Sequence, residues 1–185
     1  MSLDIYEVIE SILDSNDGEV RGRTAIQKLV YLSKAVVPEL RVPPYRPHYY
    51  GPYCSDLSLA LEKMVAYSFI EEVKVPGHMY EGYTYRLTID GLDLVKSIKV
   101  NQKKQYDEIK RLVKTCKQFC ELRINPLSYA AKIFFMLESL PKNERKMSYQ
   151  EAVNKAERFG WNIIHEDVEH GVQLLETLNL VKVER

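Results

Sequence analysis

Hydrophobic positions repeat with a helical period in three segments near the start of the chain. In the first segment these positions are Ile5, Val8, Ile9, Ile12 and Leu13. They follow the spacing i, i+3, i+4, i+7, i+8, which places them on one side of a helix. The pattern predicts helices over residues 3–15, 24–37 and from about 55 to 67, the second one closed by a proline.

The period then changes from 3.6 to 2. Residues 69–75 and 83–87 alternate apolar and polar side chains, and a Pro-Gly-His turn at 76–78 separates them. This pattern is typical of two strands joined as a hairpin. Thr88 is suited to begin a helix over 89–98, and the aromatic run 48–50 predicts one further short strand.

The order helix, helix, short strand, helix, strand, loop, strand is that of a winged helix-turn-helix domain, with the hairpin as the wing. Beyond it, the pattern predicts a long helix over 102–122, further helices at 127–140, 148–159 and 165–178, and a terminal strand at 180–183. The fold class is therefore mainly α with a small β-wing.

Three regions follow from this pattern. Residues 1–98 form the winged helix-turn-helix domain, 99–123 a long connecting helix, and 124–185 a C-terminal helical domain. Residues 174–184 loosely repeat the pattern of residues 61–72. The C-terminal domain is therefore either a degenerate second winged helix or a helix that simply runs into a strand.

Charge is balanced overall and uneven locally. Lys and Arg number 26, as do Asp and Glu, so the net charge is zero, unlike a strongly basic nucleic-acid binder. Residues 21–50, however, carry six basic side chains and one acidic one, and residues 101–123 carry seven basic and three acidic. Local basic segments of this kind attract phosphates.

The first basic segment supplies the predicted nucleic-acid contacts. Arg21, Arg23 and Thr24 lie at the start of the second helix, where free backbone N–H groups and guanidinium charge favour a phosphate. The pattern places Lys28 one turn further along a polar face, and the alternative is an ordinary solvated face. Arg46 precedes a cluster of aromatic residues, 48–53, that either stacks on bases or fills the seam between helices.

The third helix is the reading helix of DNA-binding winged helices. Lys63 is its one basic side chain, and its polar face also carries Asp56, Ser58 and Glu62. Two acids against one base are poorly suited to approach phosphates, so this helix argues against ordinary major-groove recognition.

The long basic helix has a regular apolar seam that permits two kinds of packing. The seam consists of Tyr106, Ile109, Val113, Cys116 and Cys120. Its spacing of three and four residues permits a homodimer through the 102–122 helix. The stripe fits packing within its own chain equally well.

Catalytic and cofactor motifs do not emerge from the sequence. The four His residues are scattered, His165 and His170 are five residues apart rather than four, and no Gly-rich phosphate loop or nucleophile elbow occurs. Three Cys without C-x-x-C spacing argue against a structural zinc or a disulfide framework. We therefore expect no enzyme activity, no cofactor and no metal. An acidic start and the lack of a long apolar run predict a cytoplasmic protein without membrane contact.

Two motifs carry a family resemblance. Residues 22–32 read GRTAIQKLVYL, and residues 49–64 contain Tyr-Gly-Pro-Tyr followed by Leu57, Leu61 and Met64. Together they resemble the YwgA-like family of bacterial and archaeal proteins and, more distantly, the Panacea domain of phage-associated proteins and antitoxins. The resemblance implies a winged-helix-like fold. On the Panacea side it implies binding of a toxin or an adaptor role.

Two functions are consistent with these observations. The first is a transcription-regulator-like protein that binds double-stranded DNA through Arg21, Arg23, Thr24, Lys28, Arg46 and Lys63. The alternative is a protein-interaction module, such as an antitoxin or a phage-associated adaptor, that uses a winged-helix scaffold without binding DNA.

Overall fold

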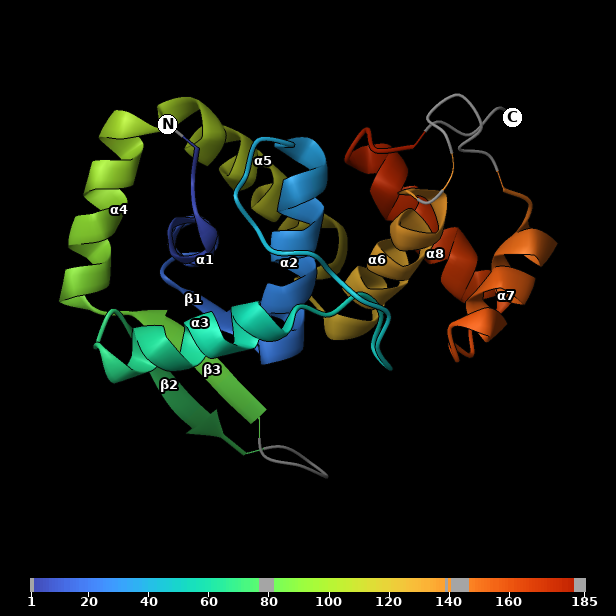
Figure 1. Ribbon diagram of the computed structural model, residues 1–185, viewed down its shortest axis with the longest axis horizontal. Helices are drawn as coiled ribbons and strands as arrows, with labels where there is room; N and C mark the ends of the chain where they lie inside the picture. The colour runs from blue at the N-terminus through green and yellow to red at the C-terminus, as the bar shows by residue number, and fades with distance from the viewer. Residues whose placement is uncertain (1, 77–81, 139, 141–146, 182–185) are drawn as a thin grey trace.

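The fold comes from a computed structural model that describes residues 2–76, 82–138, 140 and 147–181. It is mostly helical with one small antiparallel sheet, as the sequence predicts (Figure 1). Its elements are α1 (Ile5–Ser15), β1 (Glu19–Arg21), α2 (Arg23–Val36), α3 (Ser55–Ala66), β2 (Ile70–Val75), β3 (Gly82–Leu87), α4 (Ile89–Asn101), α5 (Lys103–Cys120), α6 (Ile124–Glu138), α7 (Tyr149–Arg158) and α8 (His165–Thr177).

The sheet joins the start of the chain to the predicted hairpin. Its strand order is β1-β3-β2, and both pairs are antiparallel. In the first pair Val20 lies opposite Tyr85, and in the second Glu72 lies opposite the same tyrosine. The hairpin and the helix order are as predicted. The predicted turn at 76–78 has Pro76 within the described residues, and its other two positions lie outside them.

One predicted strand was wrong, and another was missed. Residues 48–50 form a turn, because His48 and Gly51 exchange backbone hydrogen bonds of 3.2 and 2.9 Å with each other rather than with a sheet. The missed strand is β1, which lies between α1 and α2. The chain reaches it through a tight turn in which Asp17 and Gly18 adopt positive φ angles of 60° and 88°.

Helix α1 lies in the middle of the N-terminal half. Asp4 begins it with a capping box, in which its side chain accepts from the backbone N–H of Glu7 and the Glu7 side chain accepts from the backbone N–H of Asp4. The helix packs against α2, α3, α4, α5 and the sheet. Because neighbours surround it, even polar residues outside its apolar stripe are buried, among them Glu10, Ser11 and Ser15.

The hairpin leads into α4 through a close contact. Thr88 caps α4 by accepting from the backbone N–H of Gly91 at 3.2 Å. Gly91 permits this approach, because a Cβ at that position would lie 2.3 Å from the backbone oxygen of Phe69. The Leu-Thr-x-x-Gly sequence thus fixes where α4 starts and where Phe69 lies.

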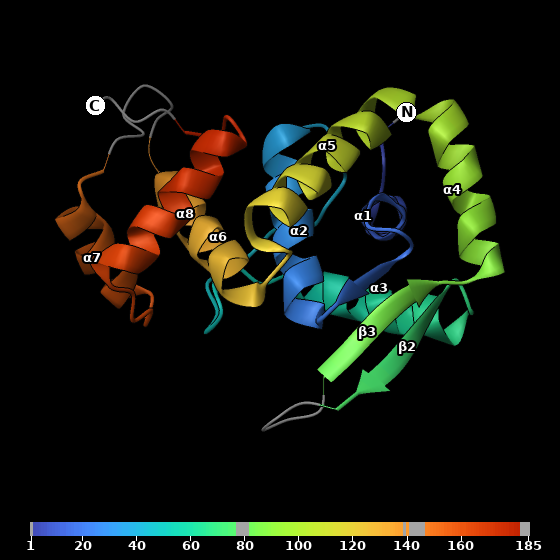
Figure 2. The same ribbon diagram turned by 180° about the vertical axis from the view of Figure 1, so that it is seen from behind.

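Helix α5 crosses the back of α1 and α2 (Figure 2). The apolar seam noted in the sequence is buried along its whole length within this chain. The predicted alternative, packing of the seam within its own chain, is therefore confirmed, while a homodimer through residues 102–122 stays a prediction. Three basic residues on the outer side of α5 pair with acids: Lys103 with Asp107, Arg111 with Glu108, and Lys117 with Asp17.

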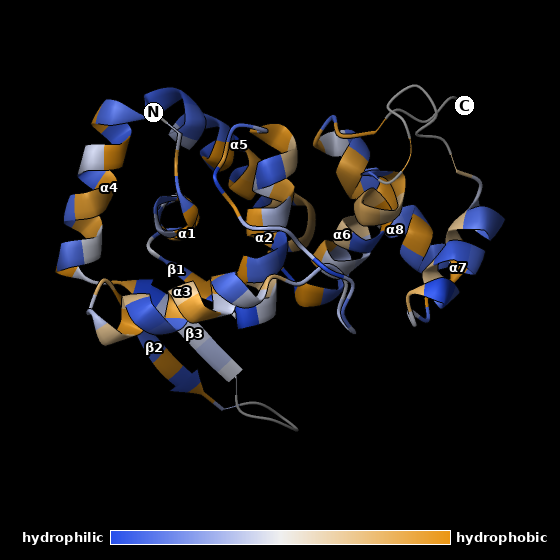
Figure 3. Cartoon of the chain, in the orientation of Figure 1, coloured by the Kyte–Doolittle hydropathy of each residue, from blue (hydrophilic) through white to orange (hydrophobic). Residues whose placement is uncertain are grey.

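The C-terminal part consists of helices joined by loops in its described residues. α6 packs on α2 and on α8, and α7 lies at the far end and is largely hydrophilic (Figures 1 and 3). Leu180 and Val181, the start of the predicted terminal strand, are not in a strand, and residues 182–183 lie outside the described part. A single cluster of buried apolar side chains extends from Leu3, just before α1, to Leu175 in α8.

Candidate functional site

Helix α3 is the element predicted from the sequence to correspond to the reading helix of winged-helix DNA binders, and one side of it is exposed. We call this side the α3 face; its exposed side chains include Asp56, Leu59, Glu62, Lys63 and Tyr67. Three- and four-residue spacing brings them onto one stripe. Leu59 is 49% exposed and Tyr67 71% exposed, so this stripe displays large apolar surface beside mixed charge.

Arg23 adjoins the α3 face, but acids already pair with its guanidinium. Its Nη2 lies 3.1 Å from Glu72 Oε2 in β2, and its Nη1 lies 4.0 Å from Glu62 in α3. Its Nε donates to the Tyr85 hydroxyl at 3.0 Å, and that hydroxyl donates to Glu72. The bond to Tyr85 and the nearby carboxylate raise the pKa of Arg23, while burial raises the pKa of Tyr85 to about 12. Arg23 thus ties α2 to α3 and the sheet.

The other predicted nucleic-acid contacts lie on several elements. Arg21 is exposed at the end of β1, Thr24 is half-buried in the first turn of α2, and Lys63 is exposed on α3. Arg46 is exposed in the loop before α3, where its backbone exchanges two 2.9 Å hydrogen bonds with Tyr53. Of this set, Lys63 belongs to the α3 face and Arg23 contacts it.

Lys28 is buried, although the sequence predicted an exposed side chain that contacts a phosphate. The sequence placed it on a polar helix face, whereas its side chain is 1% exposed and its Nζ donates to the Pro52 carbonyl at 2.7 Å. Burial, aided by the like charge of Lys132, lowers the pKa of Lys28 to about 7. A buried lysine that holds a loop is unavailable to a phosphate.

The motif residues around Lys28 hold the proline-rich loop against α2. The Gln27 amide donates to Cys54 O at 2.8 Å and accepts from Cys54 N at 3.0 Å. The Tyr45 hydroxyl donates to Gln27 O at 3.3 Å. Gly51 faces the two lysine stems at a φ of +94°, and a Cβ there would lie 3.0 Å from Lys132 Cγ. We call this contact region, formed by α2 and residues 45–54, the loop seam.

The aromatic cluster at 48–53 divides between two environments. Tyr53 is half-buried, and its hydroxyl lies 2.9 Å from the Ser58 hydroxyl. This residue fits the predicted alternative in which the aromatic cluster fills the seam between helices. Tyr49 and Tyr50 instead point outward, 72% and 52% exposed. The carbonyl of His48 accepts a 2.6 Å hydrogen bond from the indole of Trp161, which connects this loop to the C-terminal part.

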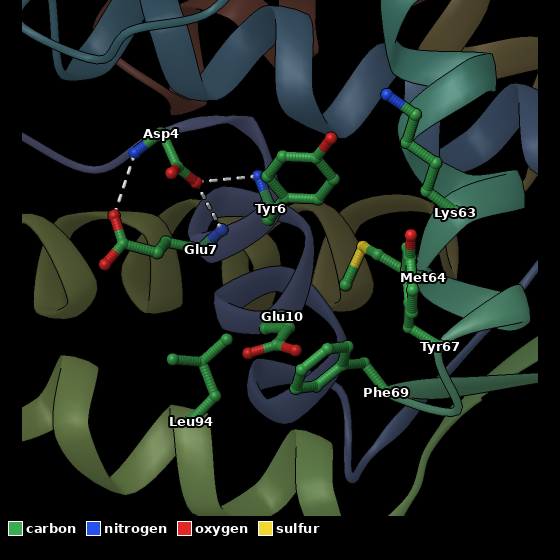
Figure 4. A pocket seen from close by; sticks show the side chains of 9 residues that line it. All are labelled: Asp4, Tyr6, Glu7, Glu10, Lys63, Met64, Tyr67, Phe69 and Leu94. Carbon is green, nitrogen blue, oxygen red and sulfur yellow. Dashed lines mark hydrogen bonds between the residues drawn. The ribbon is translucent and has the colours of Figure 1, made fainter.

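A pocket of about 360 Å³ opens between α1, α3, α4 and the start of β2. Figure 4 shows the Glu10 carboxylate beside the ring of Phe69, with Met64 and Tyr67 on the α3 side. Glu10 is fully buried, and neither of its oxygens accepts a hydrogen bond from the described residues. Sequence reasoning missed this residue, because nothing in the pattern of residues 3–15 distinguishes a buried acid beside the apolar stripe from an exposed one.

The described part of the chain offers little for metal or membrane chemistry. Across residues 2–76, 82–138 and 147–181, no three His, Cys, Asp or Glu side chains gather closely enough to hold a metal ion. Cys54, Cys116 and Cys120 are buried free thiols. None of the helices described here is both long and apolar enough to cross a membrane.

Comparison with known proteins supports one part of the resemblance. The chain is 36% identical over 80 residues to the uncharacterized protein YwgA of Bacillus subtilis (strain 168). The match covers 42% of this chain and 46% of that protein, so the chain spans less than half of this relative's length. No family model matches the chain. A partial similarity to YwgA is therefore confirmed, while the relation to the Panacea domain stays a prediction.

Proposed function

We propose that the protein is a non-enzymatic interaction module that binds another protein through the α3 face and the adjoining hairpin. The observation that carries this proposal is the pairing of Arg23 with Glu62 and Glu72, which removes the strongest predicted phosphate ligand from this surface. Such a pairing favours a partner that presents mixed charge and apolar side chains.

The charges on this surface support a protein partner because they balance. With Arg23 included, the described residues of α3, β2 and β3 carry four acids and four bases; they are Asp56, Glu62, Glu71 and Glu72 against Arg23, Lys63, Lys74 and Arg86. Binding to DNA gains its affinity from several unpaired cations that neutralise phosphates. A balanced surface supplies little of that affinity.

The apolar side chains of the α3 face support the same conclusion. Leu59 and Tyr67 stand on either side of Glu62 and Lys63, and both are about half exposed or more. Aromatic and aliphatic residues surrounded by charged ones are typical of protein interfaces, where tyrosine in particular is enriched. The apolar surface of Leu59 and Tyr67 contributes nothing to contacts with phosphates, which need cations and hydrogen-bond donors.

Site-specific photo-crosslinking tests this proposal directly. A photoreactive side chain at Leu59, on the α3 face, is introduced in the organism that makes the protein. Val100, an 80% exposed apolar residue on α4, serves as the matched control. We expect one stoichiometric protein adduct from position 59, reduced by a Tyr67→Asp substitution and absent from position 100. Equal adducts at both positions, or none at position 59, would contradict the proposal.

DNA binding is the second candidate, and the element order favours it. The sheet order β1-β3-β2 and the hairpin after α3 reproduce the arrangement of winged-helix DNA binders. Arg21, Arg46 and Lys63 are the exposed cations among the predicted contacts. Anisotropy of a labelled mixed-sequence duplex at about 50 and 200 mM salt separates the two functions. Micromolar binding that weakens steeply with salt would favour DNA, and no such binding is what the protein-partner proposal expects.

A further inference from the structure

The pocket at the junction of α1, α3 and α4 has mostly apolar walls. Its volume of about 360 Å³ lies within the range of small-molecule sites. Its lining side chains are Asp4, Tyr6, Glu7, Glu10, Lys63, Met64, Tyr67, Phe69 and Leu94. Figure 4 shows that these residues come from three helices and from the turn before β2, so the site has walls on several sides.

Two of the three carboxylates in the pocket are committed to the helix start. Asp4 Oδ1 accepts from the backbone N–H groups of Tyr6 and Glu7 at 3.0 and 3.1 Å, and Glu7 Oε2 accepts from Asp4 N at 2.9 Å (Figure 4). Glu7 also accepts from the amide of Gln102 at 3.4 Å. These two acids have structural partners.

Glu10 differs from Asp4 and Glu7 because its carboxyl group has no hydrogen-bond partner among the described residues. Its side chain is 0% exposed. An unpaired buried polar group costs about 1–3 kcal/mol, and an unpaired buried charge costs more. Burial, together with the negative charges of Glu7 and Asp4, raises the pKa of Glu10 to about 8. Lys63, the one basic lining residue, is exposed to solvent.

We propose that this pocket binds a small organic amine, with its ammonium group paired to Glu10 and its apolar body against Met64, Phe69 and Leu94. Even with Glu10 protonated, the carboxylates of Asp4 and Glu7 against the one lysine leave the pocket negative overall, which favours a cation over an anion. The apolar walls favour a hydrocarbon body over a hydrated metal ion. An amine of this shape satisfies the buried carboxylate, whereas a neutral or anionic molecule of the same shape leaves it without an ionic partner.

Proton balance gives the binding a pH signature. In the empty pocket Glu10 holds a proton at neutral pH, and pairing with an ammonium group releases that proton to solvent. The titratable groups that line the pocket with Glu10 are Asp4, Tyr6 and Glu7 from the start of α1, and Lys63 and Tyr67 from α3; Phe69 and Leu94 are uncharged. Amine affinity should therefore increase by up to about tenfold per pH unit up to pH 8, where Glu10 becomes ionised.

Three probes with one apolar body test the proposal by titration calorimetry. They are 2-phenylethylamine, 2-phenylethanol and phenylacetate, measured on the full chain at pH 6 and pH 8. We expect the amine to bind at least tenfold more tightly than the alcohol at pH 8, and to gain more than tenfold between the two pH values. Phenylacetate should bind weakest at both.

Two matched variants distinguish a pocket effect from a general one. Glu10→Gln keeps the shape and removes the charge, so the amine should lose its advantage over the alcohol while the fold persists. Glu169→Gln, at an exposed position on α8, should bind like the wild type. Equal affinity of amine and alcohol in the wild type overturns the proposal. So does the absence of binding by 2-phenylethylamine and by longer arylalkylamines up to about 10 mM, a concentration at which only very weak sites remain empty.

Discussion

Lys28 in the loop seam and Glu10 in the pocket are both buried ionisable residues in the same half of the molecule. Lys28 donates to the Pro52 carbonyl, and the Gln27 amide beside it has both of its polar atoms paired with Cys54. Among the described residues, neither oxygen of Glu10 has a hydrogen-bond partner. Folding normally pairs buried polar groups, so a paired one is explained by the structure it holds. An unpaired carboxyl group that also lines a pocket leaves a place where a ligand can supply the partner, and this contrast separates the two regions.

Removing the paired amide should have the largest effect. Gln27→Ala leaves the N–H and C=O of Cys54 buried without partners, and each costs about 1–3 kcal/mol. We expect the free energy of unfolding, measured with urea at pH 7, to fall by roughly 3 to 5 kcal/mol with the lost packing included. Gln118→Ala, at an exposed position on α5, should change it by less than about 0.5 kcal/mol. If Gln27→Ala lowered the free energy of unfolding by an equally small amount, other contacts would be holding residues 45–54 against α2.

The two regions also show what sequence reasoning can and cannot reach. The pattern of apolar positions predicted α1, α2, α3 and the hairpin, because each of these buries one regular face. It missed β1, because three residues become a strand only through pairing with β3. The same pattern placed Lys28 on a polar face of α2, and only the return of residues 45–54 over that face buries it.

Glu10 could not be predicted for a related reason. On α1 it lies beside the apolar stripe, where a helix at the surface would expose it to water. The packing of α3, α4 and the start of β2 around α1 closes that side. This enclosure depends on residues more than fifty positions away, such as Met64 and Leu94, which no local pattern relates to Glu10. Local sequence patterns therefore predict the helices and the hairpin, whereas the pocket forms only when these elements pack together.

The second prediction concerns Glu10 and pH. Its pKa in the folded protein, about 8, exceeds the usual value of 4.5, so between these values the folded state holds a proton that the unfolded state has lost. Rising pH therefore favours unfolding. The stability of the wild type relative to Glu10→Gln should fall by about 3 kcal/mol from pH 5 to pH 7.5. Urea unfolding at several pH values measures this, with Glu169→Gln as the control that should parallel the wild type.

The third prediction reverses the sign at Lys28. Its pKa of about 7 lies below the usual value of 10.5, so between these values the unfolded state binds a proton that the folded state lacks, and rising pH favours folding. Lys28→Met removes this dependence as well as the bond to Pro52. The variant should therefore lose about 2 kcal/mol more, relative to the wild type, at pH 9 than at pH 7.5. Lys104→Met, exposed on α5, should show no such difference.

Together the last two effects separate the regions within one titration. Between pH 7 and 8 the falling contribution of Glu10 and the rising contribution of Lys28 oppose each other, so the wild type should show little net change there. Each single variant exposes the slope of the other residue: Glu10→Gln should gain stability with pH across this interval, and Lys28→Met should lose it. If both variants instead shift stability by a constant amount, neither side chain is as isolated from water as its burial indicates, and the contrast between a paired and an unpaired buried charge fails.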